Sequence, residues 1–132
     1  MTSAIVVDDD FDTVEVFSEF LSLRDIDIVG KAYDGLEGLK LFEEKHPDIV
    51  FSDIWMPDYD GFYLLENLKK NHPESKIIMI TADLTQKTFE KLKKLNADSI
   101  LFKPFEIDNV MNAISKVTNE QKKTISNVNF IE

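Results

Sequence analysis

No cysteine occurs anywhere in the chain, so neither a disulfide framework nor a thiolate metal site can form. Any covalent chemistry must therefore use a hydroxyl, amine, imidazole or carboxylate group. Long apolar runs are also missing. The stretch from Ile77 to Ile80 is far too short to span a bilayer, and no basic region precedes an apolar one at the N-terminus. We therefore expect a cytoplasmic protein without membrane contact.

Basic residues are scarce beside acidic ones, since 15 Lys and Arg stand against 25 Asp and Glu, for a formal net charge of -10. Such a charge repels phosphate backbones and argues against direct nucleic acid contact. The acidic excess alone indicates no more than a soluble surface. The length of 132 residues favours a single domain. We assign residues 1–118 to that domain and 119–132 to a short polar C-terminal tail. The sequence leaves open whether it is a stand-alone protein or a piece of a longer one.

Five short apolar segments alternate with five segments of helical spacing. The apolar segments are 4–7, 26–33, 49–51, 76–81 and 99–102, and the helical patterns are 11–21, 36–47, 62–73, 89–95 and 107–117. Asn96 is expected at a left-handed helix stop, and Pro104 in the first turn of the last helix. Apolar strands each followed by a helix predict a parallel sheet covered on both faces. The fold class is then α/β, a doubly wound five-stranded sheet of the flavodoxin-like (βα)5 type with strand order 2-1-3-4-5.

Polar side chains stand at the ends of four of these strands. Asp8 and Asp9 follow the first strand and Asp53 the third, while Thr81 ends the fourth and Lys103 follows the fifth. In the order 2-1-3-4-5 these strand ends surround one crevice. Two carboxylates about 4 Å apart repel by roughly 4 kcal/mol at an effective dielectric near 20, so the three together require a cation, and hard oxygen ligands favour Mg²⁺. Lys103 can pair with a carboxylate or a phosphoryl oxygen, and Thr81 offers a hydroxyl donor.

The remaining acidic residues and the histidines have simpler interpretations. Asp10 and Asp12 suit helix N-terminal caps or dipole partners, and Asp58 and Asp60 suit the turn before Gly61. The two histidines each precede a proline at a helix exit, where we expect loop residues with no partner in reach: His46 and His72.

Four motifs occur in order at the predicted strand ends: Val6-Val7-Asp8-Asp9-Asp10, Asp53-Ile54-Trp55-Met56-Pro57 with Gly61, Thr81-Ala82, and Lys103-Pro104-Phe105. With them the chain resembles the receiver domain of bacterial and archaeal response regulators over about residues 3 to 118. The resemblance implies that Asp53 accepts a phosphoryl group from the phosphohistidine of a sensor histidine kinase or a phosphotransfer protein. It implies Mg²⁺ held by Asp8, Asp9, Asp53 and the backbone carbonyl of Trp55. It also implies phosphoryl-binding groups at Thr81, Ala82, Lys103 and the backbone of Trp55.

The resemblance further implies a switch and no activity beyond the domain's own phosphorylation and dephosphorylation. Thr81 and position 100 would form the switch region, and the surface of strand four, helix four, strand five and helix five would bind a downstream protein or output domain, with a homodimer as a further option. Two positions depart from the family pattern. Ile100 stands where the family usually has Tyr or Phe, and Trp55 is bulkier than the usual residue.

Two alternatives remain. Asp8 and Asp10 also satisfy the Asp-x-Asp opening of a haloacid dehalogenase-like phosphohydrolase, but that family needs another acidic pair after a strand downstream of its lysine. Here Asp108 follows Lys103 on a predicted helix. A receiver-like module that never accepts phosphate is the other alternative, although such a module would be expected to lose part of the acidic site. The receiver interpretation is therefore favoured.

Overall fold

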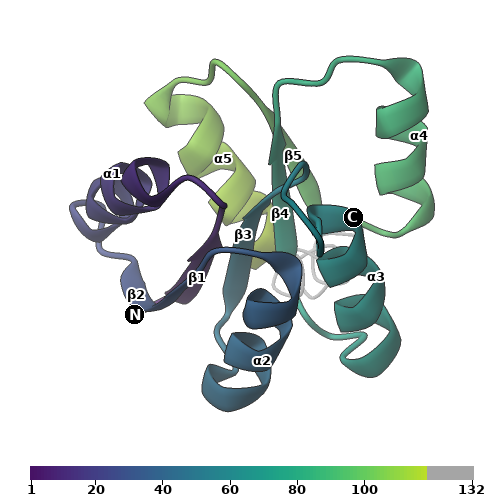
Figure 1. Ribbon diagram of the computed structural model, residues 1–132. Coiled ribbons are helices and arrows are strands. Elements are labelled where there is room, and N and C mark those ends of the chain that lie inside the picture. The colour runs from purple at the N-terminus through teal and green to yellow at the C-terminus, as the bar shows by residue number, and fades with distance from the viewer. Residues whose placement is uncertain (119–132) are drawn as a thin grey trace, which may run out of the picture.

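A computed structural model describes residues 1–118, which form a three-layer α/β sandwich (Figure 1). The strands are β1 Ser3–Val7, β2 Asp27–Ala32, β3 Ile49–Asp53, β4 Ile77–Thr81 and β5 Ser99–Phe102. The helices are α1 Phe11–Ser22, α2 Gly35–Lys45, α3 Gly61–Asn71, α4 Gln86–Lys94 and α5 Ile107–Thr118. All neighbouring strands pair in parallel in the order β2-β1-β3-β4-β5. The predicted fold class and strand order are confirmed. The predicted tail, residues 119–132, lies outside the described residues.

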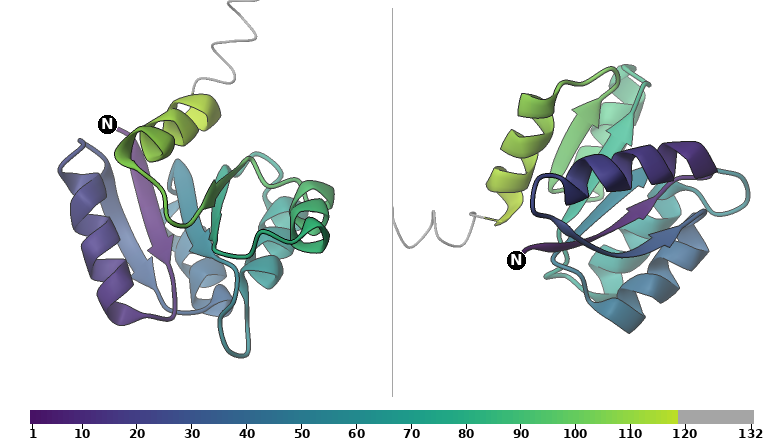
Figure 2. Two further views of the ribbon diagram at one scale, coloured as in Figure 1. Left: turned by 90° about the horizontal axis from the view of Figure 1, so that it is seen from above. Right: turned by 90° about the vertical axis from the view of Figure 1, so that its left-hand side faces the viewer.

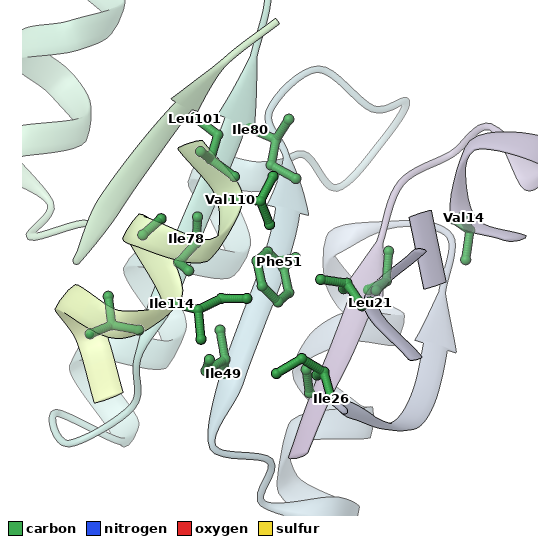
Figure 3. Packing of buried hydrophobic residues seen from close by; sticks show 14 residues of the cluster. Val14, Leu21, Ile26, Ile49, Phe51, Ile78, Ile80, Leu101, Val110 and Ile114 are labelled. Carbon is green, nitrogen blue, oxygen red and sulfur yellow. The ribbon is translucent and has the colours of Figure 1, made fainter. Parts of the chain in front are cut away.

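The sheet is covered on both faces, with α1 and α5 on one side and α2, α3 and α4 on the other (Figure 2). Side chains of β3, the central strand, alternate between the two cores, so Ile49 and Phe51 face α1 and α5 while Val50 faces α2 and α3. Figure 3 shows Phe51 in the middle of the core between the sheet and α1 and α5. The ring of Phe17 meets the Phe51 ring edge-on, with 5.3 Å between the ring centroids. Burial on both faces explains why this strand is apolar without alternation. Within residues 1–118, no helix is long and apolar enough to cross a bilayer.

The start of α5 differs from the expectation for Pro104. The proline lies in the bend before the helix, after a cis peptide bond, and the helix begins only at Ile107. The reason is a local cap: the backbone N–H of Glu106 donates to the side chain of Asn109 at 2.9 Å, and the N–H of Asn109 donates back to the Glu106 carbonyl at 3.0 Å. Asn96, by contrast, takes the expected left-handed conformation after α4, with φ of 68°.

A mostly buried ion pair links α3 to β4 and to the start of β5. Lys69 Nζ lies 2.7 Å from Asp98 Oδ2, and the two side chains are only 15% and 13% exposed. The same oxygen accepts from the backbone N–H of Ile77 at 2.8 Å, while Lys69 also donates to the Ser75 carbonyl at 2.6 Å. Both members of the pair thus make a further hydrogen bond to the backbone, which is the condition for a buried charge to be tolerated.

We expect Asp98→Ala to lower the free energy of unfolding by about 2 to 3 kcal/mol, because it leaves the Lys69 ammonium buried without its counterion. The matched control is Glu15→Ala, which removes the exposed pair that Glu15 makes with Lys31 at 2.9 Å and should cost less than about 1 kcal/mol. Urea denaturation at neutral pH measures both. Equal losses of unfolding free energy in the two variants would contradict the conclusion that the Lys69–Asp98 pair is the buried, stabilising one.

Candidate functional site

The backbone register of the sheet brings the predicted site residues to one edge. Asp8 follows β1, whose Val7 pairs with Ser52, and Asp53 is the next residue of β3. Asp53 pairs in turn with Ile80, so that Thr81 ends β4 beside it, and Thr81 pairs with Phe102 just before Lys103. The N–H of Lys103 donates to the Thr81 carbonyl at 2.8 Å, which extends the β4–β5 pairing to the site itself.

Three aspartates gather at this edge. Oxygen atoms of Asp8, Asp9 and Asp53 all lie within 4.8 Å of one another, and among residues 1–118 no other three His, Cys, Asp or Glu side chains meet so closely. Asp8 is buried, with 7% of its surface exposed, and its Oδ1 accepts from the backbone N–H of Asp10 at 3.0 Å. Asp9 is exposed and Asp53 half-buried. The cluster therefore opens to solvent on the side of Asp9.

The charge of this cluster is only partly balanced within the chain. Burial raises the pKa of Asp8 to about 6, and the neighbouring carboxylates of Asp53 and Asp9 add to the rise, against the N–H of Asp10 and the charge of Lys103. Burial likewise raises the pKa of Asp53, against the charge of Lys103. Carboxylates that resist ionisation because they are buried together are suited to a divalent cation, and an all-oxygen donor set fits Mg²⁺. The residues present therefore fit the predicted ion.

Lys103 lies near the cluster but does not form a hydrogen bond to Asp53. Its Nζ lies 3.8 Å from Asp53 Oδ1, longer than a hydrogen bond, and 36% of its side chain is exposed. The ammonium can thus approach an additional group at Asp53 with little rearrangement. Thr81 is almost fully buried, and its hydroxyl oxygen accepts from the N–H of Asp83 at 2.9 Å.

Gly61 allows the loop after Asp53 to close on itself. A β-carbon at this position would lie 2.2 Å from the Asp53 carbonyl oxygen and 2.8 Å from the Ile54 α-carbon. The N–H of Gly61 donates to the Ile54 carbonyl at 2.7 Å. Asp60 caps α3 by accepting from the Tyr63 N–H at 2.9 Å, so its predicted structural role is confirmed. The loop that follows Asp53 therefore has no room for a side chain at position 61.

Comparison with known proteins identifies the family that has this fold and this cluster. The sequence profile of the response regulator receiver domain matches residues 4–115. The chemotaxis protein CheY of Listeria monocytogenes is 33% identical over 116 residues, covering 88% of this chain and 98% of that protein. The chain belongs to the response regulator receiver family. A probable C4-dicarboxylate response regulator, DctR of Bacillus subtilis, is 27% identical, and this receiver spans 55% of it.

Solved structures agree with the family. A DNA-binding response regulator of the LuxR family from Staphylococcus aureus has a TM-score of 0.85 at 30% identity, over 90% of this chain and 100% of that one. The CheX–CheY complex with beryllofluoride and magnesium from Borrelia burgdorferi has a TM-score of 0.83 at 25% identity, over 89% of each chain. The haloacid dehalogenase alternative lacks its second acidic pair among the described residues, because β5 is their last strand and Asp108 lies in α5.

Sequence reasoning missed a polar network in the loop before α4 of this receiver. Asp83 accepts from the Thr88 hydroxyl at 2.7 Å and from the Thr85 N–H at 2.9 Å. These hydrogen bonds, that of Thr88 above all, lower the pKa of Asp83 to about 2, with a smaller contribution from the Trp55 side chain. Thr85 is the N-cap residue of α4. The sequence did contain one signal for this cap, because Thr85 stands three residues before Thr88 at the start of a helical pattern.

The structure also places the two residues that depart from the family pattern, Trp55 and Ile100. The ring of Trp55 is about half exposed, at 55%, and meets the ring of Phe62 edge-on at 5.5 Å. Ile100 is half-buried against the core between the sheet and α2, α3 and α4. An aliphatic side chain there offers no ring that could turn between buried and exposed positions.

Two of the structural interpretations need correction. Asp10 does occupy the N-cap position of α1, but its carboxylate accepts from the Thr13 hydroxyl instead of a backbone N–H. The two histidines do have partners: the rings of His46 and His72 lie 6.0 Å apart, and His72 Nε2 is 3.3 Å from Glu43 Oε2. The expectation of isolated loop residues was wrong because it ignored the packing of α2 against α3, which places both helix ends together.

The raised pKa of Asp8 predicts how stability depends on pH in the metal-free protein. The folded state holds the Asp8 proton up to about pH 6, whereas the ordinary value is 3.8. Stability from this group is thus complete below about pH 4 and is lost as the pH rises through 6. We expect Asp8→Asn to raise the free energy of unfolding by about 1 to 3 kcal/mol at pH 7 in EDTA, and by much less at pH 4. Urea denaturation at both pH values tests this, and a difference that is independent of pH would refute it.

Proposed function

We propose that this receiver is a phosphoacceptor in which Asp53 takes a phosphoryl group from the phosphohistidine of a sensor histidine kinase or phosphotransfer protein. The observation that carries the proposal is the meeting of Asp8, Asp9 and Asp53 within 4.8 Å, with Lys103 3.8 Å from Asp53. An acceptor needs a carboxylate that is exposed enough to be reached and charges that stabilise what it receives. Asp53 is half-buried at the open edge of the sheet, which meets the first requirement.

The transfer itself needs little beyond positioning and charge. A carboxylate oxygen of Asp53 attacks phosphorus in line with the P–N bond of the phosphohistidine. That bond breaks, its electron pair returns to the imidazole nitrogen, and an aspartyl phosphate remains. The ammonium of Lys103, the hydroxyl of Thr81 and backbone N–H groups near Ala82 and Trp55 would hold the three outer oxygens. The chain thus promotes its own modification and is not proposed as a conventional enzyme.

Asp8, Asp9 and Asp53, with the backbone carbonyl of Trp55, would hold the Mg²⁺ ion. The ion when bound supplies positive charge that offsets the carboxylates and the incoming phosphoryl oxygens. The raised pKa of Asp8 supports this assignment, because burial first, and then the neighbouring carboxylates, disfavour its ionised form unless a cation is present. The N–H of Asp10 donates to Asp8 Oδ1 and so helps to hold this carboxylate in place.

Phosphorylation would act on the loop between β4 and α4. The phosphoryl group adds about 1.5 to 2 negative charges at Asp53. A Thr81 hydroxyl that turns to donate to this group disturbs the bond that Thr81 now accepts from the Asp83 N–H, and Asp83 in turn holds Thr85 and Thr88 at the start of α4. A coupling of about 1 to 3 kcal/mol is typical of such two-state elements.

The switched surface would comprise β4, α4, β5 and α5 and would bind a downstream protein or output domain, or a second copy of the chain. Four exposed lysines cover α4, namely Lys87, Lys91, Lys93 and Lys94. The Borrelia burgdorferi neighbour was solved as a complex of CheY with another protein, CheX, in the presence of beryllofluoride and magnesium. By similarity, this chain would also bind a protein partner in a way that depends on phosphorylation.

Acetyl phosphate with Mg²⁺ should add one phosphoryl group to the protein, and intact-mass spectrometry at neutral pH counts it. Asp53→Ala should abolish the adduct because the nucleophile is lost. Asp60→Ala is the matched control, since Asp60 only caps α3, and it should still be labelled. Undiminished labelling of the Asp53 variant would end the proposal.

Beryllofluoride, a mimic of the phosphoryl group, should change amide hydrogen exchange at residues 81–88. A coupling of about 1 to 3 kcal/mol corresponds to a change of roughly 5- to 150-fold in exchange rates. β5 around Ile100 should change less, because no ring moves there. The Asp53→Ala variant serves as the control and should show no response. Uniform protection of β5 without any change at 81–88 would count against this route.

A further inference from the structure

The only two histidines of the chain lie together at the far ends of α2 and α3. His46 is the C-cap residue of α2 and His72 that of α3, and their ring centroids are 6.0 Å apart with planes at 78°. The largely buried ring of Phe42 contacts both, at 5.7 Å from His46 and 5.0 Å from His72. Packing against the buried ring of Phe42 therefore keeps both imidazoles in one small region of the surface.

A carboxylate completes the group. Glu43 of α2 places Oε2 3.3 Å from His72 Nε2, and the side chains are 48% and 22% exposed. His46 is exposed, and its backbone is left-handed with φ of 46°, a conformation that usually selects Gly or Asn at this helix end. The N–H of His46 donates to the Phe42 carbonyl at 2.7 Å, which holds this residue at the helix end.

The electrostatic surroundings favour a cation. Each helix ends in carbonyl groups that carry partial negative charge, and the two ends meet here. Glu43 adds a full negative charge. The cluster is also distinct from the aspartate site, because it follows α2 and α3, just before β3 and β4 begin, whereas Asp53 lies at the other end of β3.

We propose that His46, His72 and Glu43 bind a divalent transition metal ion, with Zn²⁺ as the best match. Two imidazoles and one carboxylate are a donor set that zinc prefers, with water in the fourth position, and that Mg²⁺ does not. Zn–N distances of about 2.0 to 2.1 Å place the centroids of two ligating rings roughly 5 to 6 Å apart, close to the separation observed. His72 and Glu43 are already adjacent. The donor atoms of all three side chains are not gathered as closely as those of the aspartate cluster, so the exposed His46 ring has to turn toward the other two.

Such an ion would join the ends of α2 and α3 without involving Asp53. It would bind whether or not the receiver is phosphorylated. Because imidazoles bind zinc through an unprotonated nitrogen, the side-chain signals of both histidines must respond together. This response separates the site from any zinc bound weakly by exposed carboxylates.

The test is calorimetric titration of the folded chain with ZnCl₂ in excess Mg²⁺, with histidine side-chain signals followed by NMR. The wild type should bind one equivalent, and both histidines should shift. His46→Asn, which keeps a residue that tolerates the left-handed backbone, and His72→Ala should each weaken binding by at least about tenfold. Glu43→Gln should weaken it too, whereas Glu44→Gln, the neighbouring exposed carboxylate, should not.

Asp53→Ala should bind zinc like the wild type, and His46→Asn should still be labelled by acetyl phosphate. The zinc proposal and the phosphoacceptor proposal can therefore be refuted separately. Absence of stoichiometric zinc binding would overturn the proposal. So would binding that both histidine variants retain, or binding that disappears in Asp53→Ala. Urea denaturation of each variant confirms that it is folded before the titration.

Discussion

The gathering of three carboxylates at one edge of the sheet, with Asp8 buried, Asp53 half-buried and Asp9 exposed, is the constraint on which the rest of this receiver depends. Parallel pairing of β1 with β3 brings Asp8 and Asp53 to the same edge, where their carboxylates repel each other. Burial makes it still less favourable to ionise these side chains, as the raised pKa of Asp8 indicates. A site with this much unbalanced charge gains most from binding a cation and from the nearby ammonium of Lys103. The raised pKa of Asp8 predicts that these aspartates reduce the stability of the metal-free fold, and the same charge favours binding of a cation.

The loops around the aspartate cluster hold its side chains in a defined geometry. Gly61 permits the chain after Asp53 to turn tightly enough for α3 to begin against the strand end. On the other side, Asp83 links the Thr81 hydroxyl to the first turn of α4 through short hydrogen bonds. Under the proposed switch, a change in what Thr81 binds would therefore reach α4 within a few residues. Ile100 adds no aromatic ring to this path, so the loop before α4 would carry the proposed change.

Much of the fold and of the aspartate site could be predicted because both follow from local patterns. Apolar segments without alternation indicated strands buried on both faces, and carboxylates directly after two of them indicated the shared edge. The helix starts were less predictable. Pro104 suits a first helical turn, yet the reciprocal bonds of Glu106 and Asn109 start α5 three residues later. The Asp83 network was missed because its partners are ordinary polar residues whose meeting depends on the path of the loop.

The sequence by itself determined the order of strands and helices, the fold class and the identity of the charged residues at the strand ends, because periodicity and strand-end chemistry are local properties. Only the tertiary structure decided which side chains meet across elements. It alone brought His46 to His72, which lie far apart in the chain but end two helices that pack side by side. It alone set the burial that raises the pKa of Asp8, since burial is a property of the assembled layers and of no single segment.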